Sequence, residues 1–273
     1  LRLWALPSAA PALRAAGLTP DLVVLTDPGY FAVYHLHGAV PGGTPLVMPV
    51  SAGTGAWRLG ARVSYFCQGT VFEREILAAA RVDGPTILPS GTVSASALEL
   101  ALRSTEGPIV FAGLDLAFRD VHSHARPNAV ELLLGTRSYR LAPLHHRLFA
   151  HAAELAPRLL EAAGQAPRAT ARSNLALETY AGWFAQCRAP AGRALYRLHP
   201  SAVPLPGLAP LSEQGLGALC RGGGASAPAV PAASAPARPY HSRAQRRGSA
   251  LAILDSWAAD IGAAVGELDT EPG

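Results

Sequence analysis

The stretch DLVVLTD, from Asp21 to Asp27, is the clearest strand pattern in this chain of 273 residues. Its apolar residues, Leu22 to Leu25, form a continuous run and do not alternate with polar residues. Such a run is typical of a parallel strand whose two faces are both covered by helices. Shorter β-like runs follow at 45–50, 61–67 and 108–113. This pattern predicts a buried parallel sheet.

Helical patterns lie between and after these strands. The spacing of apolar residues predicts helices at 9–16, 72–81, 94–103, 145–163, 173–187 and 211–219. Two further short runs, at 139–142 and 194–198, favour strands. Short strands that alternate with longer helices predict the α/β class, with a mostly parallel sheet and flanking helices.

The composition divides the chain into three parts. Residues 1–220 carry the α/β pattern, whereas residues 221–247 are rich in Gly, Ala, Ser and Pro. A segment of that composition buries too little apolar area to offset its ordering entropy, so we expect a flexible linker. Residues 248–273 have helical apolar spacing, which predicts a C-terminal amphipathic helix and tail. That helix either docks on the domain or binds a partner.

Charge and hydropathy argue against two classes of partner. The formal net charge is +4, but the basic residues are all Arg and are scattered along the chain. A nucleic-acid groove binder concentrates such residues on one face, so we expect no nucleic-acid partner. No apolar run reaches the ~18 residues of a membrane span, and Pro7 and Pro11 interrupt the apolar N-terminus. We therefore expect a cytoplasmic protein without a membrane span.

The ends of two predicted strands carry carboxylates. Asp27 ends the first apolar run, and Asp115 follows Gly113 at the exit of another, in GPIVFAGLDLAF. Ligands of open parallel sheets bind beyond the carboxyl ends of the strands. If the two strands are parallel neighbours, both carboxylates arrive at one edge of the sheet. The alternative for Asp27 is a plain cap on the next helix.

A turn of small and hydroxyl residues, Gly91-Thr92-Val93-Ser94, opens the predicted helix at 94–103. Free backbone N–H groups at a helix start favour an anion such as phosphate. The alternative is ordinary capping by Thr92 or Ser94. A P-loop is excluded because the chain has no Lys.

Two polar residues after Asp115 are further candidates. His124 lies in VHSHARPN, and its ordinary pKa near working pH suits a general acid or base. The alternative is a histidine on a surface loop. Asn128 ends the same stretch. Zinc is not indicated, because His122 and His124 lack helical ligand spacing and Cys67, Cys187 and Cys220 lie far apart.

Three stretches together resemble a known family. PDLVVLTDPGYF, GTVSASALELAL and GPIVFAGLDLAFRDVHSHA are similar to the 6-hydroxymethylpterin diphosphokinase MptE-like family, which includes the motility accessory factor (Maf) flagellin glycosyltransferases. The family's strand ending in Asp corresponds to Asp27, and its helix start corresponds to 91–97. Its G-x-D-(L/F) strand exit and trailing H-A correspond to 113–116 and to His124-Ala125. The resemblance extends over residues 20 to 215.

The resemblance implies a Rossmann-like, sialyltransferase-like domain that binds a nucleotide-activated donor. In the glycosyltransferase branch the donor is a cytidine-monophosphate-linked nonulosonic acid and the acceptor is flagellin. In the diphosphokinase branch ATP donates a diphosphate to a pterin alcohol, with Mg²⁺ held by Asp27 and Asp115. A third alternative is a relative that binds the nucleotide-sugar without catalysis. His124 and Asp115 are the implied catalytic residues. The implied binding residues are Asp27, Gly91, Thr92, Ser94, Gly113 and Asn128.

Two features depart from the family pattern. Family members begin with a strand and a Gly-rich GxGPSL turn, and no stretch of this sequence corresponds to them. We therefore expect the domain described here to lack that strand and turn. Leu114 stands where Gln is common, which removes one polar contact beside Asp115.

Overall fold

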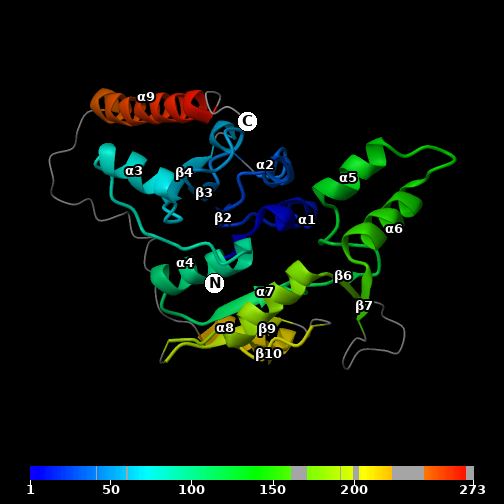
Figure 1. The fold of residues 1–273 in the computed structure, drawn as a ribbon. Helices are drawn as coiled ribbons and strands as arrows, with labels where there is room; N and C mark the ends of the chain where they lie inside the picture. The colour runs from blue at the N-terminus through cyan, green and yellow to red at the C-terminus, as the bar shows by residue number, and fades with distance from the viewer. Residues whose placement is uncertain are drawn as a thin grey trace.

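The computed structural model describes residues 1–40, 42–59, 61–160, 171–190, 192–198, 203–222 and 243–268. Parallel sheets with flanking helices confirm the predicted α/β class (Figure 1). The predicted parallel strands, however, are divided between two parallel sheets, and a small antiparallel sheet lies beside them.

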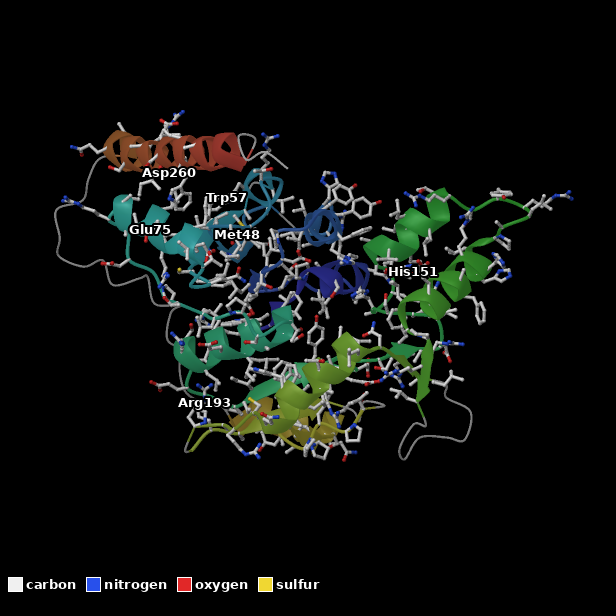
Figure 2. All side chains as sticks on the ribbon, viewed as in Figure 1. Met48, Trp57, Glu75, His151, Arg193 and Asp260 are labelled. Carbon is white, nitrogen blue, oxygen red and sulfur yellow. The ribbon has the colours of Figure 1, made fainter. Side chains whose placement is uncertain are left out.

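The first sheet contains the strand on which the fold prediction rests. Its four strands are parallel in the order β1-β2-β3-β4, namely Trp4–Ala5, Leu22–Val24, Pro45–Pro49 and Arg62–Phe66. Its connecting and following helices are η1 (Pro7–Ala9), α1 (Ala10–Ala15), α2 (Tyr30–Leu36), η2 (Ala56–Arg58) and α3 (Val71–Ala79). Val23 packs with Met48 in one buried cluster, and Val24 packs with Phe66 in another. Both faces of β2 are therefore covered, as the apolar run predicts (Figure 2).

The other two sheets come from the second half of the chain. The second parallel sheet has the order β10-β9-β5, with strands Ala209–Leu211, Leu195–Leu198 and Ile109–Ala112. The antiparallel sheet has the order β6-β8-β7, with strands Phe118–Arg119, Ala171–Ser173 and Arg158–Leu160. The helices of this half are α5 (Ala129–Thr136), α6 (Leu144–Leu155), α7 (Leu175–Gln186) and α8 (Glu213–Gly222).

Helix α4 (Val93–Ser104) joins the two parallel sheets (Figure 1). Leu100 packs in the cluster of β2 and β4, whereas Leu98 packs in the cluster of β9 and α7. The Arg193 guanidinium, just before β9, donates hydrogen bonds to the Leu102 and Gly107 carbonyls at 2.9 and 2.8 Å (Figure 2). The Leu102 carbonyl is one of those that the end of α4 leaves without a partner in the helix, and Gly107 lies in the segment that leads to β5. Apolar packing and hydrogen bonds therefore both hold α4 to the second sheet.

A fully buried carboxylate organises the loops after β3 and β4. Glu73 of α3 accepts hydrogen bonds from the Ser51 backbone N–H (3.3 Å), the Ser51 hydroxyl (2.8 Å) and the Gln68 N–H (2.5 Å). A buried charge needs several such donors to offset its lost hydration. The two loops are thereby held to one helix.

Two sequence predictions need correction, and two helices were not predicted. The helix predicted at 145–163 ends at Leu155, and β7 follows, because Pro157 supplies no N–H and disfavours helical geometry before it. The predicted strand at 139–142 is a turn closed by one Tyr139–Ala142 bridge. Helices α2 and α5, with 7 and 8 residues, were not predicted from the sequence.

The C-terminal helix packs on the first sheet's outer helix. Helix α9 (Arg243–Leu268) lies against α3, and the Phe72 and Trp257 rings are 5.5 Å apart (Figure 1). Of the two alternatives for the C-terminal helix, docking on the domain and binding a partner, this arrangement agrees with docking. Of the predicted linker, 221–222 belong to α8 and 243–247 to α9, and 223–242 lie outside the described residues. Within the described part of the chain, no helix has the length and hydropathy to cross a membrane.

We predict that truncating the buried side chain that α4 places against the second sheet destabilises the protein. Leu98 is 1% exposed, so Leu98→Ala should lower the free energy of unfolding by about 2–5 kcal/mol. Leu141→Ala, at a leucine that is 78% exposed, is the control and should change it by less than about 0.5 kcal/mol. Urea denaturation measures both, and equal effects would contradict the assigned role of α4.

We also predict that Glu73 is the more sensitive of two glutamates on α3. Glu73→Gln places an amide N–H₂ among groups that already donate, and should lower the free energy of unfolding by about 2 kcal/mol. Glu75→Gln, on the exposed side of the same helix, is the matched control. Similar stabilities of the two variants in urea denaturation would rule out the buried network as a stabilising element.

Candidate functional site

Asp27 forms a turn between β2 and α2. Its carboxylate is exposed, and Oδ1 accepts a hydrogen bond from the Gly29 N–H at 2.6 Å. A Cβ atom on residue 29 would lie 2.8 Å from that oxygen, so a larger residue there would displace the Asp27 carboxylate. Gly29 in turn is the N-cap residue of α2. Asp27 therefore shapes the start of α2 while its carboxylate remains accessible.

Asp115 leaves β5 through a backbone of unusual conformation. Gly113 has φ +72° and Leu116 has φ +48°, and the left-handed region is rare for leucine. Leu114 and Leu116 both pack in the cluster around α4 and α7, which holds this conformation in place. The half-buried Asp115 lies between them in the sequence and close to Arg197 of β9. Burial lowers the pKa of the Arg197 guanidinium, and the negative charge of Asp115 partly opposes that shift.

The two carboxylates do not share a sheet edge. Asp27 follows β2 of the first sheet, whereas Asp115 follows β5 of the second, so the two strands are not the parallel neighbours that the shared-edge prediction assumes. Within the described residues, no group of three or more His, Cys, Asp or Glu side chains has an arrangement that could hold a metal ion. A joint Mg²⁺ site of Asp27 and Asp115 therefore stays a sequence prediction without geometric support.

The turn before α4 is arranged as a helix cap. The Thr92 hydroxyl accepts a hydrogen bond from the Ser94 N–H at 3.3 Å, and Ser94 is buried. Gly91 has φ +79°, and a Cβ atom on it would lie 3.1 Å from the ring of Tyr180 on α7. The capping alternative therefore accounts for Thr92 and Ser94, and the close approach of α7 accounts for Gly91. Phosphate binding by this turn stays a prediction.

Asn128 has a structural role in the described chain. It is buried, and it caps α5 by accepting the Glu131 N–H at its Oδ1 (2.9 Å). Its Nδ2 donates to the Ala125 carbonyl at 3.3 Å. Because both ends of the amide have protein partners, Asn128 offers little to a bound substrate.

His124 lies in a cluster of three histidines from three different elements. The ring centroids of His35 in α2 and His124 in the loop after β6 are 5.4 Å apart, and His151 of α6, which Figure 2 labels, lies close enough to lower the pKa of His124. The Ala129 N–H donates to His35 Nδ1 at 3.4 Å. The Ser123 hydroxyl and His124 Nδ1 form a hydrogen bond of 2.8 Å. We call His35, His124 and His151 the histidine cluster.

The cluster keeps His124 neutral. Burial is the main cause of its lowered pKa, the positive charges of protonated His35 and His151 act in the same direction, and together they take the pKa from 6.5 to about 4. Burial also lowers the pKa of His35. At neutral pH the His124 ring is therefore unprotonated and cannot act as an imidazolium acid, and as a base it is weaker than an ordinary histidine. His124 does lie in a loop, as the surface-loop alternative has it, but its side chain is half-buried.

Sequence reasoning missed three residues of this region. His35 belongs to none of the sequence motifs described above, yet it is 6% exposed, whereas His37 is exposed. The sequence motifs described above likewise include neither His151 nor Arg197. The available signals were a histidine in an apolar helix and a lone Arg within the β-like run at 194–198.

Two open cavities lie beside helices α5 and α6. The larger, of about 740 Å³, is lined by Arg126, Pro127, Glu131, Leu132, Gly135, Thr136 and Leu144. The smaller, of about 260 Å³, is lined by Leu134, Ala142, His146, Arg147, Ala150, His151 and Glu154. Neither includes Asp27, Asp115 or the turn before α4. The smaller one reaches the histidine cluster through His151.

The lowered pKa of His124 predicts acid destabilisation. The unfolded chain takes up a proton at this residue near pH 6.5, whereas the folded chain does so only near pH 4. Stability is therefore complete above pH 6.5 and should fall by up to about 3 kcal/mol as the pH drops toward 4. Urea denaturation between pH 7.5 and 4.5 measures this fall.

Glutamine does not titrate, so His124→Gln should lose the fall in stability that His124 causes between pH 7.5 and 4.5. His37→Gln is the matched control, because His37 is exposed and lies two residues after His35. This variant should leave the pH dependence of stability unchanged. An unchanged pH dependence in His124→Gln would show that His124 titrates normally in the folded protein.

Comparisons of the chain with protein-family models, with curated proteins and with solved structures find no match.

Proposed function

We propose that the chain is a Maf-like transferase domain that uses a nucleotide-activated nonulosonic acid as donor and a flagellin hydroxyl as acceptor. The observation that carries this proposal is the meeting of His35 with His124. His35 lies in the helix that follows the Asp27 turn, and His124 closes the GLDLAF-to-SHA stretch. The helix that follows one stretch resembling the family and the end of another thus meet in one partly buried, polar centre.

The chemistry assigned to this centre is proton transfer during glycosyl transfer. Neutral His124 accepts the proton of the acceptor hydroxyl, and the oxygen then bonds to the anomeric carbon of the donor. The bond from that carbon to the phosphate oxygen breaks, and cytidine monophosphate leaves with the electron pair. A positioned base of this kind contributes about 10²–10⁴-fold to a rate. Asp115 positions the donor, and Asp27 contacts donor hydroxyls.

The parallel strands and the strained exit of β5 support a Rossmann-like, sialyltransferase-like domain as the finer description of the fold. Left-handed backbone in a bulky residue such as Leu116 is often retained at sites with a function. The diphosphokinase alternative needs acids that converge on Mg²⁺. We place it second because Asp27 and Asp115 follow strands of different sheets.

The proposal predicts selective stabilisation by cytidine monophosphate. A ligand at a hundred times its dissociation constant adds about 2.7 kcal/mol to the free energy of unfolding, which is visible as a rise in Tm. Asp115→Asn should abolish that rise, whereas Asp83→Asn, at an exposed loop carboxylate, should keep it. Stabilisation by ATP with Mg²⁺ alone would favour the diphosphokinase, and no response to either nucleotide would end the proposal.

Turnover separates an enzyme from a binding relative. Hydrolysis of a cytidine-monophosphate-linked nonulosonic acid should fall by about 10²-fold or more in His124→Gln, because the base is lost. Binding of cytidine monophosphate should stay unchanged, and His37→Gln should behave as the unsubstituted protein. Donor binding without any hydrolysis or transfer would identify the chain as a non-catalytic nucleotide-sugar-binding relative.

A further inference from the structure

The smaller cavity has a charge pattern that the proposed function does not use. It lies between α5, the turn at 139–142 and one face of α6. Its polar lining comes from α6, with Arg147 near the start of the helix, His151 one turn later and Glu154 near the end. Leu134, Ala142 and Ala150 form the apolar part. At about 260 Å³ it is smaller than the pockets that hold drug-sized ligands.

Arg147 has hydrogen-bonding capacity that the described residues do not use. Its Nε atom is buried and has no hydrogen-bond partner there. The guanidinium carbon lies 5.6 Å from the centre of the Tyr139 ring, a cation–π distance that restricts its orientation. Within the described chain, no ion pair joins Arg147 to a carboxylate, whereas Arg103, Arg126 and Arg158 each have one. A half-buried arginine without a counter-ion is an uncompensated positive charge.

The surroundings do not neutralise that charge. No acidic residue lies in the first turn of α6. Glu154 is seven positions after Arg147, about 10 Å along the helix. His146 and His151, the other titratable residues in the lining, add only positive charge when they are protonated. An oxyanion is the ligand chemistry that an arginine fork binds best, through paired N–H···O bonds.

We propose that this cavity is a binding site for a small hydroxylated oxyanion, whose phosphate or carboxylate group binds Arg147. Hydrogen-bonding hydroxyls of the ligand face Glu154, which accepts from them. The aliphatic residues Leu134 and Ala150 contact the carbon skeleton between the two ends. The cavity adjoins the histidine cluster through His151, but its proposed role does not depend on the proposed donor chemistry.

The His151 side chain connects the site to the histidine cluster. It lines the cavity, and it also lies near His124. A bound anion stabilises protonated imidazole nearby, so binding should raise the pKa of His151. This effect gives a readout in the unsubstituted protein that a purely structural Arg147 would not produce.

Calorimetric titration of the whole chain at low salt and pH 7.5 tests the proposal. The probes are glycerol 3-phosphate, glycerate and uncharged glycerol, which separate phosphate, carboxylate and hydroxyl contributions. We expect one or both anions to bind and glycerol not to bind. Arg147→Gln should weaken that binding at least tenfold, whereas Arg140→Gln, which makes the same charge change at an exposed residue of the adjacent turn, should leave it within twofold.

A second measurement does not depend on any variant. Histidine ring resonances, followed by NMR through a pH titration with and without the bound anion, should show a higher pKa for His151 when the ligand is present. Absence of binding by both anions, equal binding by Arg147→Gln, or an unchanged His151 titration would each overturn the proposal. Because the probes contain no cytidine, failure of the donor-binding experiment would leave this result unaffected.

Discussion

The simultaneous packing of α4 against two parallel sheets is the constraint on which the rest of the structure depends. Leu100 faces the cluster of β2, β3 and β4, and Leu98 faces the cluster of β9 and α7. Burying one leucine side chain stabilises a fold by about 1.5–3 kcal/mol, and the same helix contributes to both cores. Thr92 caps its first turn and Arg193 binds carbonyls at its end. The two sheets are therefore held through a single element.

That arrangement decides which polar groups meet. Because β2 and β5 belong to different sheets, the carboxylates after them are not brought to a common edge. The segments that follow those strands nevertheless converge, since α2 packs beside α5 and thereby places His35 against His124. The centre that results is built from neutral rings and not from paired acids. Within the described residues, no group of three or more His, Cys, Asp or Glu side chains there could hold a metal ion, so the chemistry assigned to this centre is proton transfer.

Burial has opposite consequences for the acidic and basic groups of the molecule. Glu73 of α3 is fully buried, and three protein donors from the loops after β3 and β4 satisfy its carboxylate. Its role is therefore structural. Arg147 is buried at its Nε atom without such compensation among the described residues, beside an open cavity. A buried polar group that the protein leaves unsatisfied is energetically unfavourable unless water or a ligand completes it. This contrast separates a structural network from a candidate binding site.

The sequence by itself determined the local elements: the apolar run of DLVVLTD predicts β2 with both faces covered, and the Thr92 cap with its apolar spacing predicts α4 to within a residue. These features depend on neighbours a few positions apart, so a short window contains their cause. Only the tertiary structure decided that the strands form two parallel sheets, that His35 is buried while His37 is exposed, and that Arg197 approaches Asp115. Strand pairing and the desolvation of a side chain depend on residues tens of positions away. The pattern of residues within one segment therefore cannot predict either.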